Sequence, residues 1–208
     1  MKSNLIKKNQ LELLYSRGLS MMDIAKKLKV SGHKIAYWMT KYEIKRRSIN
    51  DALYMKYNPG GNPFKIKKPT NANEAYLYGL GLGIYWGEGN KADKYSIRVG
   101  TTDPDMILIF RKFMETFCKI AQSKFKYNLM CFKDSSPKIA KKFWIKKLDL
   151  NSNQIGKITS LKPLGKGTYR KISQYGVCTI YVFNIKLKKW LMDQLDLIKY
   201  NKTLIMPT

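Results

Sequence analysis

The sequence predicts an α+β protein with a small helical module at the N-terminus and a larger mixed α/β domain after it. The chain has 208 residues, which is enough for one medium domain and one small one. Apolar residues recur at helical spacing in the first part, whereas helical and strand spacing alternate in the last part. A hydrophobic content of 44% is sufficient for a packed core.

The charge balance predicts a polyanionic partner. Forty Lys and Arg residues oppose fourteen Asp and Glu residues, so the formal net charge is +26. Such a chain repels itself when it is compact, and nucleic acid is the polyanion that most often relieves this repulsion. A Lys-rich surface inherited from an AT-biased genome is the alternative explanation, but it does not account for the scarcity of acids. We expect double-stranded DNA as the partner.

Other features of the sequence exclude several classes of protein. No run of about 18 apolar residues predicts a transmembrane helix, so no membrane partner is expected. The segment MKSNLIKKNQ lacks the apolar core of a secretory signal. The three cysteines, Cys118, Cys131 and Cys178, are widely spaced and form no CxxC pair, which argues against zinc and disulfides. We expect a cytoplasmic, nucleoid-associated location, or its organellar or viral equivalent.

The N-terminal module is predicted to contain three helices, at 4–17, 21–28 and 32–42. Gly18 stands where the first helix should end, and Ser20 is a typical N-cap for the second. The last two helices share an apolar set that should pack them together: Ile24, Ala25, Leu28, Val30, Ile35 and Trp38.

Residues 18–47, GLSMMDIAKKLKVSGHKIAYWMTKYEIKRR, resemble the helix-turn-helix of resolvases and many repressors. Lys29 departs from the pattern, which usually has Gly there. The resemblance implies a DNA-binding module over 1–47 whose third helix enters the major groove. The DNA contacts expected from its outward face and basic tail are Ser31, His33, Lys34, Tyr37, Lys41, Lys45, Arg46 and Arg47. A solvated surface position is the alternative for each of them.

Residues 48–73 are predicted to form a basic linker, with a short helix at 48–57 and a Pro- and Gly-rich loop at 58–63. The linker could follow the DNA backbone or lie in a minor groove. A soluble tether is an equally good interpretation.

The segment 74–91, EAYLYGLGLGIYWGEGNK, is the most informative part of the sequence. Its alternating apolar residues permit a strand, but Gly79, Gly83 and Gly87 at four-residue spacing favour a helix with one glycine face. Such a face allows a second helix to approach closely, so it is predicted to be a dimer helix. Glu88 stands at the C-terminal end of the helix, where the dipole disfavours an acid, and this suggests that it binds a cation.

Within this helix GLGIYWGEG, residues 81–89, resembles a single, diverged LAGLIDADG motif. Gly83 and Gly87 match the small residues of the motif, Glu88 its metal-binding acid and Gly89 its last glycine. Trp86 replaces the first, non-catalytic Asp, and Glu replaces the usual catalytic Asp. The resemblance implies that Glu88 is both catalytic and a ligand of Mg²⁺.

The elements after the motif support the resemblance to LAGLIDADG homing endonucleases. Strands are predicted at 95–101, 124–132, 156–161 and 177–183, and helices at 103–118, at 137–148 and after Asn184. The last two strands look like a pair joined by a loop that is basic over 162–171. The family implies an α-β-β-α-β-β-α plan over 74–208 with a concave antiparallel sheet laid over DNA. Its first hairpin would be short, around 90–98, and the helix at 137 would be an insertion.

The family also implies Mg²⁺-dependent double-strand cleavage of DNA. A single motif supplies a single acid, so a homodimer would bring two copies of Glu88 together. Strand alternation makes Lys91, Arg98 and Lys126 the candidate basic catalytic residues. The main alternative is a non-cleaving transcriptional regulator built on a degenerate LAGLIDADG domain, and a further one is an RNA-binding maturase.

Overall fold

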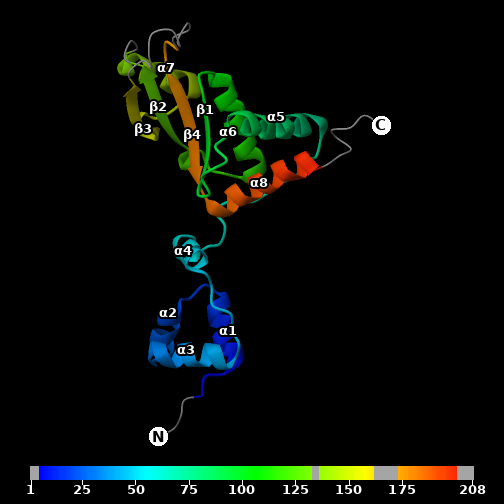
Figure 1. The fold of residues 1–208 in the computed structure, drawn as a ribbon, viewed down its shortest axis with the longest axis vertical. Coiled ribbons are helices and arrows are strands. Elements are labelled where there is room, and N and C mark those ends of the chain that lie inside the picture. The colour runs from blue at the N-terminus through cyan, green and yellow to red at the C-terminus, as the bar shows by residue number, and fades with distance from the viewer. Residues whose placement is uncertain (1–4, 133–135, 162–172, 201–208) are drawn as a thin grey trace. The chain divides into compact units, whose positions relative to one another are not determined.

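The computed structural model describes residues 5–132, 136–161 and 173–200. Within these ranges the chain forms eight α-helices and one four-stranded sheet, which confirms the predicted α+β class (Figure 1). The chain divides into two compact units, Met1–Pro63 and Phe64–Thr208. No helix in the described ranges combines the length and apolar character needed to cross a membrane.

The first unit contains α1 (Lys8–Ser16), α2 (Met21–Leu28), α3 (Gly32–Lys41) and α4 (Ile49–Tyr57). The first three helices pack around one small core, to which Ile6 contributes from the extended segment before α1. Helix α1 begins later than predicted because Lys7, its N-cap, has an extended backbone and no side-chain cap. The buried core residues are Ile6, Leu11, Leu14, Ile24, Ala25, Ile35, Trp38 and Met39.

Local signals set the turns of this unit. The Ser20 hydroxyl accepts a hydrogen bond from the Asp23 N–H, and the Asp23 carboxylate accepts one from the Ser20 N–H, so α2 begins with a capping box. Lys29 ends α2 in the left-handed conformation with φ of 52°. This explains why glycine is usual at this position, since glycine adopts such a φ without steric cost.

Arg47 joins α4 to the helical module. Its guanidinium donates hydrogen bonds to the carbonyl oxygens of Tyr15, Gly18 and Leu19, and it lies 3.9 Å from the Tyr15 ring centroid. It also contacts the Met55 sulfur in α4. These bonds satisfy carbonyls around the end of α1, so the first unit extends beyond the predicted boundary at residue 47.

The rest of the predicted linker belongs to the second unit. The N–H groups of Lys65 and Lys67 donate to main-chain carbonyls at the end of α6 (Pro104–Cys118). Lys67 also binds Glu74 in the first turn of α5 (Ala72–Glu88) at 2.5 Å. Because Lys67 and both polar groups of Thr70 donate to this carboxylate, the pKa of Glu74 falls to about 2. The segment is therefore fastened to the domain that follows it.

The second unit is built around a mixed sheet. Its remaining elements are β1 (Ser96–Thr101), β2 (Lys126–Phe132), α7 (Pro137–Leu148), β3 (Ile155–Leu161), β4 (Val177–Phe183) and α8 (Ile185–Tyr200), with single 3-10 turns at Gln122–Lys124 and Ser152–Gln154. The strand order is β1-β4-β2-β3. Strand β4 is antiparallel to both β1 and β2, whereas β2 and β3 are parallel.

This topology corrects two predictions. The sheet is not antiparallel throughout, and β3 does not pair with β4. Helix α7 carries the chain back over the sheet, so β3 runs parallel to β2, as a crossover connection requires. Strand β4 then enters between β1 and β2. The basic loop predicted at 162–171 lies outside the described residues.

The core lies between the helices and one face of the sheet. Alternate strand residues, such as Val99, Leu129 and Ile180, share one buried cluster with side chains of α5, α6, α7 and α8. Figure 1 shows α5, α6 and α8 to one side of the strands. The strand faces predicted from alternation are confirmed, since Ile97 and Val99 are buried and Arg98 is exposed. The opposite face of the sheet carries the other set of side chains.

The glycines of α5 lie on two sides of the helix, one packed and one open. Gly81 faces α6, where an added Cβ would lie 2.2 Å from the Phe113 Cγ, so this glycine allows the two helices to pack. Gly79, Gly83 and Gly87 lie on the opposite side, and an added Cβ at any of them would have no atom within 4 Å. The predicted helix and its glycine face are both confirmed, and among the described residues Gly81 is the α5 glycine that packs against another helix.

We predict opposite effects of alanine at two of these glycines. Gly81→Ala should lower the melting temperature, because overpacking a core costs about 1–3 kcal/mol. Gly83→Ala should raise it, because alanine in a helix is about 1 kcal/mol more favourable than glycine and the site has room. Thermal unfolding followed by circular dichroism at low protein concentration tests both. Equal shifts in the same direction would contradict the α5–α6 packing.

Candidate nucleic-acid interface

The outward face of α3 carries several of the predicted DNA contacts. Ser31 is the N-cap, and its hydroxyl accepts a hydrogen bond from the Lys34 N–H at 3.2 Å. His33 is exposed, and Tyr37 is 59% exposed. The Lys41 ammonium lies 5.0 Å from the Trp38 ring centroid and 5.9 Å from that of Tyr37. The helix thus presents polar, aromatic and basic groups together.

The basic tail after α3 divides into two parts. Lys45 and Arg46 are exposed. Arg47 is half-buried, and its guanidinium is occupied by the carbonyls of α1 and the turn after it. Its role in the structure is therefore to hold the unit together. This role could not be predicted, because Lys45, Arg46 and Arg47 form one uninterrupted basic run in the sequence.

The open face of the sheet carries a row of basic and aromatic side chains across three strands. Arg98 in β1 is opposite Tyr181 in β4, and Tyr181 is in turn opposite Lys126 in β2. Directly paired residues of antiparallel strands project to the same face, about 5 Å apart at Cβ. None of the four strand sequences contains an acidic residue. This face is therefore basic and lacks acidic side chains of its own.

The strand register brings Glu88 to the sheet edge beside β1, two positions along that strand from Arg98. Glu88 is the last residue of α5, and the next residue, Gly89, forms a β-bridge with Val99. The Asn90 N–H then donates to the Arg98 carbonyl at 3.0 Å. This two-residue arm beside β1 is what remains of the short first hairpin predicted around 90–98. Glu88 thus lies at the sheet edge next to the strand that carries Arg98.

The Glu88 carboxylate is exposed and makes no hydrogen bond or ion pair with any residue in the described ranges. Arg98, in contrast, is held in position. Its Nε donates to the Ser96 hydroxyl at 2.7 Å, and its guanidinium pairs with Asp93 at 3.4 Å. Hydrogen bonds from Ser96 and from the Tyr95 N–H lower the pKa of Asp93, with a smaller contribution from Arg98. The carboxylate of Asp93 therefore stays charged.

A buried lysine fixes the turn that carries Glu88. Lys188 of α8 is only 3% exposed, and its ammonium donates to the Tyr85 hydroxyl and to the Asn90 carbonyl. The Tyr85 hydroxyl donates to the same carbonyl at 2.7 Å. Desolvation lowers the pKa of Lys188 and raises that of Tyr85. Sequence reasoning missed Lys188, because it reads as one more lysine of a surface helix.

Two further residues complete this turn. Lys91, a predicted catalytic residue, donates its ammonium to the Trp86 carbonyl and so caps the end of α5. Gly89 is buried, and an added Cβ would lie 2.3 Å from the Tyr85 carbonyl oxygen. The close passage of the chain there requires glycine. Of the four predicted catalytic residues, the structure brings Glu88, Arg98 and Lys126 to the sheet face or its edge, while Lys91 binds the helix end.

The glycine face of α5 forms the floor of an open groove of about 540 Å³. Between Glu74 and Glu88 the helix has no charged residue, so it is apolar on its exposed side as well as its buried one. A helix that is apolar all round is normally covered all round. The groove is lined by Tyr76, Gly79, Leu80, Gly83, Ile84, Gly87, Glu88 and Met106.

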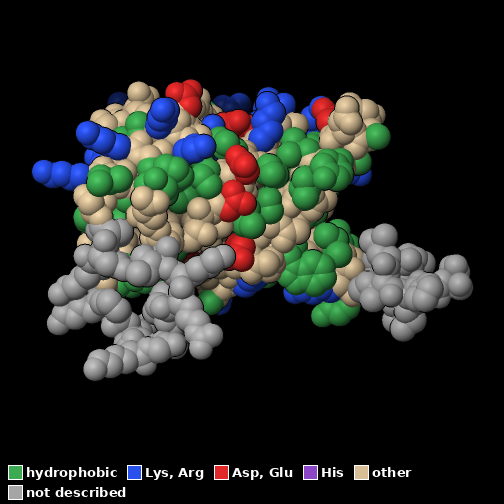
Figure 2. Space-filling model, turned by 90° about the horizontal axis from the view of Figure 1, so that it is seen from above, with side chains coloured by type: hydrophobic (Ala, Val, Ile, Leu, Met, Phe, Trp, Pro, Cys, Tyr) green, Lys and Arg blue, Asp and Glu red, His purple; other side chains and the backbone are tan. Residues whose placement is uncertain are grey.

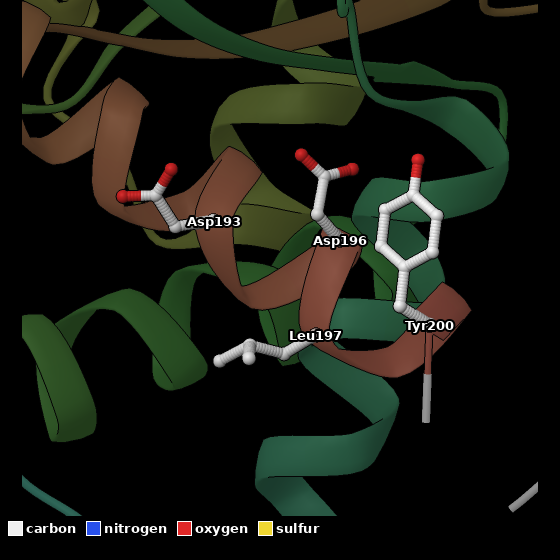
Figure 3. A pocket seen from close by; sticks show the side chains of 4 residues that line it. All are labelled: Asp193, Asp196, Leu197 and Tyr200. Carbon is white, nitrogen blue, oxygen red and sulfur yellow. The ribbon is translucent and has the colours of Figure 1, made fainter. Parts of the chain in front are cut away.

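Other acids and thiols offer no competing centre. Asp193 and Asp196 lie on the exposed side of α8, and Asp196 lies between Asp193 and Tyr200 (Figure 3). Within the described ranges no group of three His, Cys, Asp or Glu residues is arranged to hold a metal ion. Cys118 and Cys178 are buried, and burial raises the pKa of each thiol to about 12. They are therefore unreactive thiols.

Lys and Arg side chains project into solvent on the face shown in Figure 2, and exposed hydrophobic side chains lie among them.

Comparisons of the chain with models of protein families, with curated proteins and with solved structures gave no match.

Proposed function

We propose that this protein is a sequence-specific DNA-binding protein that acts as a homodimeric, Mg²⁺-dependent endonuclease of the LAGLIDADG type. The observation that carries the proposal is the strand register. Gly89 forms a β-bridge with Val99 and Asn90 pairs with Arg98, so Glu88 lies at the sheet edge two positions along β1 from Arg98. Arg98 begins the row that continues through Tyr181 to Lys126. An unpaired carboxylate and two cations at a basic sheet face suit phosphodiester chemistry.

The element order supports the resemblance. When α7 and β3 are set aside as an insertion, the second unit reads α5, the arm at 89–90, β1, α6, β2, β4 and α8. This is the α-β-β-α-β-β-α plan that the family implies. The parallel strand β3 then lies at the edge of the sheet, next to β2. An added edge strand leaves the antiparallel pairs β1–β4 and β4–β2 intact.

The open groove on α5 supports a dimer. A second copy of α5 would cover the apolar face that the chain itself leaves exposed. Glycines without neighbouring atoms permit the close approach of two backbones. A two-fold axis along this contact would bring the two copies of Glu88 to the same end of the groove, since Glu88 lines it.

The carboxylates available to hold Mg²⁺ suffice in the proposed homodimer but not in a single chain. Proteins usually hold Mg²⁺ through one or two carboxylates together with substrate phosphates and water. Each chain supplies one such carboxylate, Glu88. The bound ion would polarise the phosphate and activate water. Arg98, oriented by Ser96 and Asp93, would bind a phosphate oxygen. Lys126 would neutralise a phosphate farther along the DNA backbone.

The first unit would supply sequence recognition. A helix such as α3, with His33 and Tyr37 exposed, suits base-edge and phosphate contacts in a major groove. The non-cleaving regulator is the second candidate. It is favoured by the lack of a second acid beside Glu88 in the described ranges and by Trp86 in place of the first Asp of the motif. Both candidates bind DNA, so cleavage separates them.

We predict that Glu88→Gln abolishes cutting but not binding. A duplex selected by binding from a random library is incubated with Mg²⁺, and nicks are counted on a gel. Cutting should fall by at least about 100-fold, because loss even of groups that support a metal ligand costs ~10–100-fold. Asp193→Asn, which alters an exposed acid on α8, is the matched control and should cut like the wild type. Binding without any cutting by the wild type would favour the regulator.

We predict that Gly83→Leu yields a monomer with an unchanged fold. The leucine side chain would occupy the open groove and keep a second α5 away, and no atom of the described residues lies within 4 Å of its Cβ position. Gly60→Leu is the matched control, because that glycine also has no atom within 4 Å. Size-exclusion chromatography with light scattering reports the mass, and circular dichroism the fold. A monomeric wild type, or a dimeric Gly83→Leu variant, would refute the paired helices.

We predict that Lys34→Ala weakens binding to the selected duplex by about 5- to 150-fold, the range for losing a specific contact worth about 1–3 kcal/mol. Lys8→Ala removes the same charge from α1 and should have a much smaller effect. Fluorescence anisotropy at fixed salt measures both affinities. Equal losses for the two variants would show that α3 does not face DNA in the way proposed.

A further inference from the structure

We propose that the open face of the sheet holds one unpaired nucleobase, stacked on Phe183 beside Arg98. This inference rests on the proposed nucleic-acid binding and names a class of ligand within it, a nucleotide that has left the base stack. The site is formed by Phe183 and Tyr181 of β4 together with Arg98 of β1.

The exposure of Phe183 is the first observation. Its side chain is 63% exposed, although the neighbouring Val182 is buried in the core. Because side chains alternate along a strand, Phe183 shares the open face with Tyr181. The two rings are 5.3 Å apart between centroids, with an interplanar angle of 78°. The two rings therefore pack edge to face, and most of the Phe183 side chain remains accessible to a ligand.

The site is held in place before any ligand arrives. The Tyr181 hydroxyl donates to the Asn128 Oδ1 at 3.4 Å, so the ring that supports Phe183 is tied to β2. Arg98 is tied to Ser96 and Asp93, and its guanidinium carbon lies 5.9 Å from the Phe183 ring centroid. A planar cation beside an exposed ring matches a nucleotide, because the ring can take the base and the cation its phosphate.

The charge of the surroundings favours nucleic acid over an apolar protein partner. The strands contain no acid, and Lys126 projects to the same face two strands away from Arg98. A polyphosphate backbone is attracted to such a face, whereas an apolar protein surface would remove water from the Lys126 ammonium without replacing its hydrogen bonds. The exposed ring and the cations are therefore best satisfied by the same ligand.

An aromatic ring can use the face of a base only when that base is unstacked. In a duplex the faces of the bases are covered by their neighbours, and the grooves present only base edges. Proteins that bind single strands or flipped nucleotides stack them on aromatic side chains, often on an open sheet. Phe183 therefore indicates a nucleotide that is bulged, flipped or single-stranded. Both DNA and RNA can provide one.

The test compares a duplex that has one bulged 2-aminopurine with the fully paired duplex, using the full chain. The wild type should bind the bulged duplex more tightly and quench the fluorescence of the 2-aminopurine. Phe183→Leu should lose this preference by about 5- to 150-fold, which corresponds to the stacking of one base, and should bind the paired duplex as before. Tyr200→Leu, an exposed aromatic on α8, should behave like the wild type.

Bulged RNA and bulged DNA form the two arms of the experiment, and tighter binding in either arm supports the site. Thermal unfolding checks that Phe183→Leu is folded. Equal binding of bulged and paired duplexes by the wild type, or an unchanged preference in Phe183→Leu, overturns the inference while leaving DNA binding intact. If the wild type binds neither duplex, the proposed function fails as well, so the two failures are distinguishable.

Discussion

The close contact of α5 with α6 at Gly81 is the constraint on which the second unit depends. Phe113 occupies the space where any other residue at position 81 would carry its Cβ. This contact fixes the rotation of α5 about its own axis, so that one side faces the core and the other faces solvent. The aromatic side chains Tyr85, Phe110, Phe113 and Phe117 continue the contact along both helices. With α5 fixed, its open glycine face and the end that carries Glu88 have defined positions.

The end of α5 is fixed by an unusual buried cation. Burying an ammonium without a partner is costly, yet Lys188 lies within the domain. It is stabilised by oxygen atoms at the C-terminal end of α5, which is the negative end of the helix dipole. Gly89 and Asn90 then join that end to β1. The turn is held from the helix side and the sheet side, and Glu88 projects from it into solvent.

Charge is distributed in a way that a net value of +26 conceals. Several acids stabilise the fold directly. The carboxylates of Asp23, Asp51 and Asp103 accept hydrogen bonds at the starts of α2, α4 and α6. Glu74 binds Lys67 in the segment before α5, and Asp93 orients Arg98. The strands hold no acid at all. The open sheet face is therefore positive because acids are missing from it, and this matters for binding because nearby acids would cancel the field of the lysines.

The sequence by itself determined the elements and their faces. Side-chain period and local capping depend on residues three or four positions apart, so the capping box at Ser20, the helix at Gly79–Gly87 and the alternation around Arg98 could be predicted. Only the tertiary structure decided the strand order, the separation of Gly81 from the other glycines, and the burial of Lys188 and Arg47. Each of these depends on atoms that are distant in sequence. A lysine or a glycine has the same local pattern whether it faces water or another helix, and only the packing of the whole domain distinguishes the two.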